Sequence, residues 1–134
     1  MSLAELRGDV VILACAISAG IHGALVPGHL DEGTGPGLGF AAATAALAAL
    51  VVWLTRRPAS LPALATAAAT LASLLASYAL AITTGLPLLH PDAEPVDGLA
   101  LATKAIEAAG LLAATSLLWR PFAVTLLQPK GTLT

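Results

Sequence analysis

The chain has 134 residues, of which 57% are hydrophobic, 10% charged and 4% aromatic, and its mean hydropathy is +0.88. This composition is well outside the range of soluble domains. The net charge of -2 and the scattered basic residues exclude the basic footprint of a nucleic-acid-binding protein. The single cysteine, Cys15, excludes an intrachain disulfide framework and a metal site built from several thiolates. The sequence therefore predicts an integral membrane protein.

Four stretches are long and apolar enough to cross a bilayer, whose hydrocarbon core of about 30 Å needs roughly 20 helical residues. The expected spans are residues 10–26, 38–55, 61–83 and 99–118. The first span is expected to stop at Pro27-Gly28, and the breaker-rich residues 33–37 are expected to form a loop before the second. We therefore predict one all-α domain over residues 1–134, a transmembrane bundle of four helices.

The positions of the basic residues predict the orientation of this bundle. If the chain crosses four times, five basic residues fall on one side of the membrane: Arg7, Arg56, Arg57, Arg120 and Lys130. Short cytoplasmic loops carry the excess of Lys and Arg, so both termini are expected in the cytoplasm. Trp53 and Trp119 lie beside these arginines, as expected for indole rings at the headgroup region.

Small residues dominate the interiors of the expected spans, as in residues 41–46 and 67–69. Small side chains allow close helix packing in a membrane, so we expect a tight bundle. In the third span Thr66, Thr70, Ser73 and Ser77 follow spacings of four, three and four and therefore share one stripe. This stripe indicates hydrogen bonds between helices or, alternatively, a polar path or ligand wall.

All three histidines and most of the acidic residues fall on the predicted outer half of the molecule. The candidate metal ligands are His22, His29, Asp31, Glu32 and His90. Imidazole and carboxylate groups suit copper or another transition metal. The alternative is a solvated membrane rim with helix caps. The two nearest histidines are seven residues apart across Pro27-Gly28, so they converge on one ion only if the chain bends sharply there.

Lys104 and Glu107 lie inside the fourth expected span, where each ion costs on the order of 3 kcal/mol if it faces lipid. At a separation of three they share one helix face and can pair within the bundle. A buried cluster with His22 is also conceivable, with Cys15 and Ser18 continuing the stripe of the first span. The pair is either a structural ion pair or part of a functional site.

The Ala, Leu, Gly and Pro bias, with the segments His22–Glu32 and Glu94–Glu107, resembles uncharacterised small four-span membrane proteins of high-GC bacteria. The resemblance covers most of the chain and implies a multi-pass protein of a bacterial plasma membrane. In size and span count the chain also resembles the small multidrug exporters, which place an essential Glu in the first span. This first span has none, so their function is not carried over.

Neither a nucleophile elbow nor a phosphate loop is present, so the sequence does not favour an enzyme, and no catalytic residue is predicted. Three hypotheses follow. The chain is a noncatalytic subunit or accessory of a membrane complex, in contact with other subunits or with copies of itself. Alternatively it binds copper through His22, His29 and His90, with help from Asp31, Glu32 or Glu107. The third hypothesis is a small transporter in which Glu107 couples transport to protons.

Overall fold

The computed structural model describes residues 1–86, 93 and 95–119, and these form four α-helices. Helix α1 spans Leu3–Glu32, α2 spans Thr34–Arg56, α3 spans Leu61–Thr83 and α4 spans Gly98–Leu118. All four are long and apolar enough to cross a membrane. The prediction of an all-α bundle with four potential transmembrane helices is confirmed. Residues 87–92 and 94, which include His90, lie outside the described residues, as do Arg120 and Lys130.

Local side-chain caps account for where three of the helices begin. Ser2 and Glu5 form a reciprocal capping box at the start of α1, and Ser60 accepts a bond from the Ala63 amide at the start of α3. Asp97 Oδ1 accepts a bond of 2.8 Å from the Ala100 amide and caps α4. These residues satisfy amide groups that have no partner within a helix.

The first helix does not end at Pro27-Gly28, as the sequence predicted. It continues through Pro27 to Glu32, and only Gly33 separates it from α2. Proline is poorly suited to a helix interior because it removes one hydrogen bond and its ring clashes with the carbonyl four residues earlier, yet its fixed φ is compatible with a helix. At about 1.5 Å per residue, the 30 residues of α1 extend for roughly 45 Å, which exceeds the hydrocarbon thickness.

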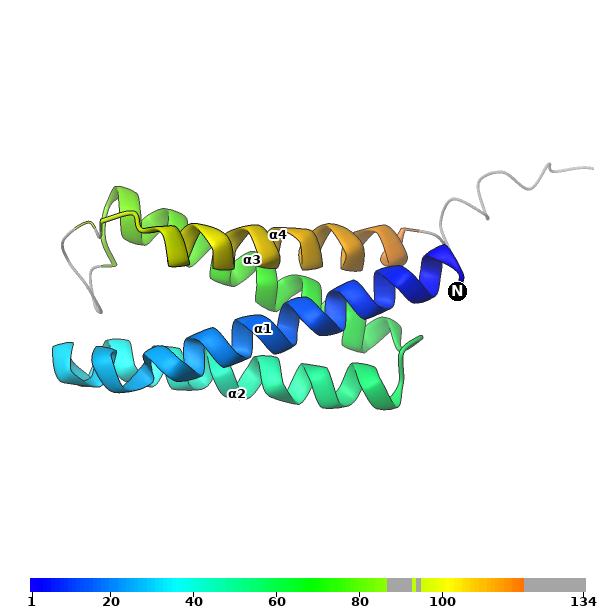
Figure 1. Cartoon of the computed structure of the whole chain (residues 1–134), viewed down its shortest axis with the longest axis horizontal. Coiled ribbons are helices and arrows are strands. Elements are labelled where there is room, and N and C mark those ends of the chain that lie inside the picture. Colours follow the sequence, from blue (N-terminus) through cyan, green and yellow to red (C-terminus); the bar gives the residue numbers. More distant parts are fainter. Residues whose placement is uncertain (87–92, 94, 120–134) are drawn as a thin grey trace, which may run out of the picture.

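The helices form two antiparallel pairs, α1 with α2 and α3 with α4 (Figure 1). α1 also packs along α4, whereas the contact between α2 and α3 is smaller. In Figure 1 the two pairs separate toward the end that holds the α1–α2 turn, and the N terminus and the end of α4 lie at the opposite end. The bundle therefore has a closed half and a divergent half.

The closed half contains the main apolar core. All four helices contribute to it, and its fully buried larger side chains include Val11, Cys15, Leu47 and Leu71. Alanines fill the closest approaches, and Ala63, Ala67 and Ala114 have no exposed surface. At Gly110 of α4 an added Cβ would lie 2.5 Å from the Ala14 Cβ of α1. The expected tight packing through small residues is confirmed at this crossing.

The polar stripe of α3 does not form the hydrogen bonds between helices that the sequence favoured. Thr66 and Ser73 are exposed on the outer surface of the bundle. Their hydroxyls donate to the carbonyls of Pro62 and Ala69 in their own helix, at 2.8 Å each. Such bonds to the preceding turn let a hydroxyl face an apolar environment without losing its partner.

Candidate functional site

Glu107 is the best-buried charged side chain described, with no exposed surface. Its two carboxylate oxygens accept different bonds. Ser18 Oγ of α1 donates to Oε1 at 2.6 Å, and Lys104 Nζ donates to Oε2 at 2.7 Å. The spacing of three within α4 places Lys104 and Glu107 on one face, as the sequence predicted. The buried carboxylate is therefore fully partnered, which offsets part of the cost of removing it from water.

His22 joins this network through Ser18. Its Nδ1 lies 2.9 Å from the Ser18 carbonyl oxygen and 3.3 Å from Ser18 Oγ. A carbonyl oxygen only accepts, so Nδ1 carries a proton, and Nε2 is an acceptor when the ring is neutral. The sequence left open whether His22, Lys104 and Glu107 meet. The structure connects them in one network between α1 and α4, with Ser18 as the link.

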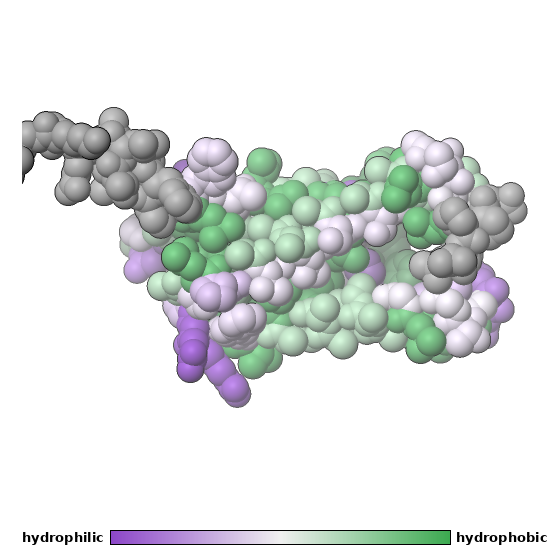
Figure 2. All heavy atoms as spheres, turned by 180° about the vertical axis from the view of Figure 1, so that it is seen from behind, coloured by the Kyte–Doolittle hydropathy of each residue, from purple (hydrophilic) through white to green (hydrophobic). Residues whose placement is uncertain are grey.

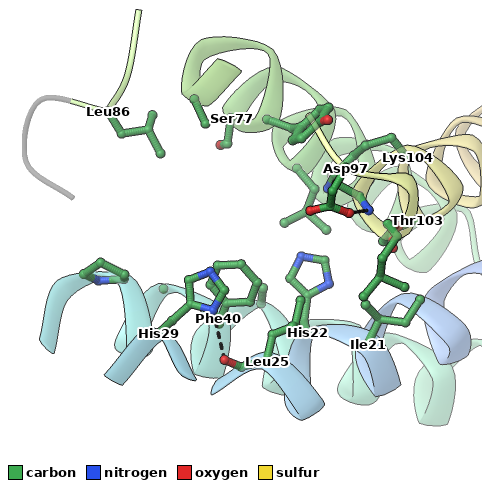
Figure 3. A pocket seen from close by; sticks show the side chains of 18 residues that line it. Ile21, His22, Leu25, His29, Phe40, Ser77, Leu86, Asp97, Thr103 and Lys104 are labelled. Atoms are coloured by element: carbon green, nitrogen blue, oxygen red, sulfur yellow. Dashed lines mark hydrogen bonds between the residues drawn. The ribbon is translucent and has the colours of Figure 1, made fainter. Parts of the chain in front are cut away.

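A cavity of about 370 Å³ lies between the two helix pairs in the divergent half. All four helices contribute to its wall, as Figure 3 shows from close by. His22 and His29 point into it from α1, opposite Lys104 of α4 and Asp97, the residue that caps α4. His22 and Lys104 therefore belong both to the buried network and to the cavity wall. A cavity of this size, mostly apolar with a few polar groups, is typical of a small-molecule site.

Phe40 of α2 holds the two histidines of α1 in place. Its ring stacks on His29 with centroids 3.7 Å apart, and the centroid of His22 lies at 5.3 Å. His29 Nδ1 is 2.9 Å from the Leu25 carbonyl oxygen, so the Nδ1 atom of each histidine bonds to the carbonyl four residues earlier in α1. Since α1 stays helical beyond Pro27, the two rings are two turns apart on one side of a single helix.

Tyr78 of α3 forms part of the opposite wall. Lys104 Nζ lies 5.5 Å from the centroid of its ring, within the range of a cation–π contact. The Tyr78 hydroxyl is buried and has no hydrogen-bond partner among the described residues. Buried hydroxyls in proteins are almost always partnered. Neither Tyr78 nor Phe40 was predicted from the sequence, because isolated aromatics in apolar spans give no positional signal.

The predicted metal ligands are distributed as follows. His22 and His29 line the cavity, Asp31 and Glu32 are exposed at the last turn of α1, and His90 lies outside the described residues. No group of three or more potential metal ligands is found within residues 1–86, 93 and 95–119. Both oxygens of Glu107 are already used by Ser18 and Lys104. The described chain thus brings together two of the predicted ligands.

A scan against protein-family models and searches of curated proteins and solved structures found no match for this chain. Its function is therefore inferred from its own residues.

Proposed function

We propose that this chain is a small accessory subunit of a complex in a bacterial plasma membrane, without catalysis of its own. The observation that supports it most is the outward face of α3. Ala65, Ala69, Ala72 and Ala76 are all exposed, and their spacings of four, three and four place them on one side of the helix. We refer to these four residues as the alanine face.

Exposed alanines also occur on α2, at Ala42, Ala45 and Ala49, and on α4, but α1 and α4 combine their exposed small residues with large ones. These last two helices expose Leu13, Ile17 and Leu112 near their centres, whereas the exposed large side chains of α3, Leu61 and Leu80, lie near its ends. Large apolar side chains suit contact with lipid, and small ones allow another helix to approach closely. The alanine face therefore fits a transmembrane helix of a partner protein.

The proposal is tested by extracting the native membrane complex in a mild detergent. Wild-type protein should bring down the same partner in constant ratio. Ala69→Leu and Ala72→Leu should lower the recovered partner about ten-fold, because a bulky side chain prevents close approach. Ala109→Leu, at an exposed position of α4, is the matched control and should leave recovery unchanged.

Two results would contradict the subunit proposal. One is wild-type protein that elutes as a monodisperse homo-oligomer with no other chain. The other is equal partner recovery from Ala69→Leu and Ala109→Leu. Helix content by circular dichroism should be the same for all variants, so that lost binding is not mistaken for lost folding.

A second candidate function is copper binding at the outer face. It is favoured by the shared geometry of His22 and His29, whose Nδ1 atoms each approach a backbone carbonyl at 2.9 Å. Metal-binding histidines commonly donate one ring N–H to such a carbonyl and use the other nitrogen for the metal. Metal analysis of purified protein should then find copper, and His22→Ala and His29→Ala should lose it. Substoichiometric metal that is the same in all three proteins would exclude this function.

A further inference from the structure

We propose that the cavity binds a neutral, hydroxyl-bearing lipid that enters from the bilayer. The opening of the cavity is the first reason. In Figure 2, the view from behind, a hollow lies between the two helix pairs in the divergent half, and hydrophilic atoms are visible inside it. The small contact between α2 and α3 is consistent with an opening between these two helices.

The depth of the opening indicates an amphiphile. Gly39 of α2 and Ser77 of α3 both line the cavity and are both exposed. They lie five and six residues from the ends of their helices at Thr34 and Thr83, which corresponds to roughly 8 and 9 Å. A molecule that enters between Gly39 and Ser77 therefore comes from the acyl-chain layer close to its boundary with the headgroups, where amphiphiles reside.

The charges of the wall favour a neutral head. Lys104 is the cationic group of the wall, and its ammonium group is paired with the Glu107 carboxylate at 2.7 Å. Asp97 caps α4 and keeps its charge, but its side chain is exposed and therefore screened by solvent. An anionic or cationic headgroup inside the cavity would therefore have no buried, unpaired charge to balance it, which is strongly unfavourable.

The hydrogen-bonding groups of the cavity wall favour a ligand whose headgroup is a hydroxyl. His22 presents Nε2 as an acceptor, because its Nδ1 is committed to the Ser18 carbonyl. The Tyr78 hydroxyl has no partner among the described residues and is enclosed by the wall, so it becomes a donor to a ligand when its ring turns toward the cavity. A hydroxyl group can donate to the first and accept from the second. Leu25, Phe40 and Leu74 line the same cavity and suit a hydrocarbon tail. A long-chain or prenyl alcohol combines these features.

The experiment uses the full chain in lipid nanodiscs and a dodecanol that carries a photoreactive diazirine. Photolabelling should map to cavity residues of α2 and α3. Four competitors with the same chain then test the head: dodecanol, dodecyl methyl ether, dodecanoate and dodecylammonium. We expect dodecanol to compete about ten-fold better than the ether, which cannot donate to His22, and better still than either ion.

Two variants test the assigned groups. Tyr78→Phe removes only the hydroxyl and should weaken competition by both dodecanol and the ether about ten-fold. His22→Phe keeps a ring but removes the acceptor, so the preference for dodecanol over the ether should disappear. Ser73→Ala, at an exposed position of α3 whose hydroxyl bonds to its own helix, is the control and should behave as wild type.

Several outcomes would overturn this inference. Equal competition by all four dodecyl compounds would show that the cavity recognises the hydrocarbon tail and not the headgroup. Preference for dodecanoate would contradict the neutral head. Labelling outside the cavity, or its absence, would exclude a lipid site. In that last case one copper ion per chain, lost in His22→Ala, would identify the cavity as the metal site, and the partner recovery test of the alanine face would be unaffected.

Discussion

The side chains of Ser18, Lys104 and Glu107 show how a charged pair is accommodated within an apolar bundle. A lone ion inside a membrane span is costly, and a buried pair is tolerated only if its remaining hydrogen-bonding positions are filled. Here the Ser18 hydroxyl donates a hydrogen bond to the second carboxylate oxygen of Glu107, and the ring of Tyr78 lies near the Lys104 ammonium group. The pair therefore has a structural basis in the bundle even without a ligand.

This pairing predicts strong coupling between Lys104 and Glu107. Glu107→Gln and Lys104→Met should each lower the free energy of unfolding by about 3 kcal/mol, because each leaves a buried charge without its partner. The double variant should lose clearly less than the sum of the two. These three variants and the wild type form a double-mutant cycle. Their free energies of unfolding are measured in detergent mixtures by circular dichroism.

The exposed residue Asp9 offers a matched control for the carboxylate change. Asp9→Asn should alter stability by less than about 0.5 kcal/mol, as is usual for surface substitutions. If the Lys104 and Glu107 effects add without coupling, the ion pair does not contribute to stability as described.

At the scale of the helices, close contacts decide features that local propensity does not. Helix α1 continues past Pro27 and meets α2 after a single residue. At this junction Gly37 lies against Leu30, and an added Cβ on Gly37 would collide with the Leu30 side chain. The turn therefore depends on Gly37, one of the breaker residues from which a loop was expected, because this glycine lets two helix ends approach closely.

The crossing of α1 and α4 gives a prediction at the same scale. Gly110→Ala should lower the free energy of unfolding by about 1–3 kcal/mol, since its new Cβ would be 2.5 Å from the Ala14 Cβ and 3.1 Å from Leu71 Cδ1. Gly20→Ala in α1 is the control, because nothing lies within 4 Å of its added Cβ. That variant should be neutral or stabilising by up to about 1 kcal/mol. Thermal unfolding in one detergent compares the two, and equal stability would rule out a close helix crossing at Gly110.

At the scale of the whole molecule, the four helices place Arg56, Arg57 and the N terminus at one end, and the cavity toward the other (Figures 1 and 3). We propose that the basic end is cytoplasmic, because positively charged short loops are retained there. This orientation would open the cavity on the extracytoplasmic side, where an accessory subunit can meet lipid or an external domain.

The orientation is tested by cysteine labelling in intact cells with a maleimide that does not cross membranes. Thr34→Cys at the α1–α2 turn should be labelled, and Ala59→Cys in the α2–α3 turn should be labelled only after the cells are opened. The native Cys15 is fully buried, so the wild-type protein is the background control. The reverse labelling pattern would invert the assignment and place the cavity on the cytoplasmic side.

Much of the fold could be predicted from the sequence, because span length and hydropathy are properties of single segments. The predicted third span, residues 61–83, coincides with α3, and the fourth differs from α4 by one residue. The site was only partly predictable. The Lys104–Glu107 pair follows from a spacing within one helix, whereas Ser18, Phe40 and Tyr78 enter the site from other helices.

The sequence by itself determined four apolar helices long enough to span a membrane, with Arg56 and Arg57 toward one end and His22 and His29 toward the other, since these features depend on composition and on distance along the chain. Only the tertiary structure decided that His22 and Glu107 join one network through Ser18, that His22 and His29 share a wall, and that a cavity separates the helix pairs. The physical reason is that contacts between helices depend on which faces meet, and in an apolar span nearly every face is equally hydrophobic. Close contacts between small residues, such as Gly110 with Ala14, then determine how the helices pack.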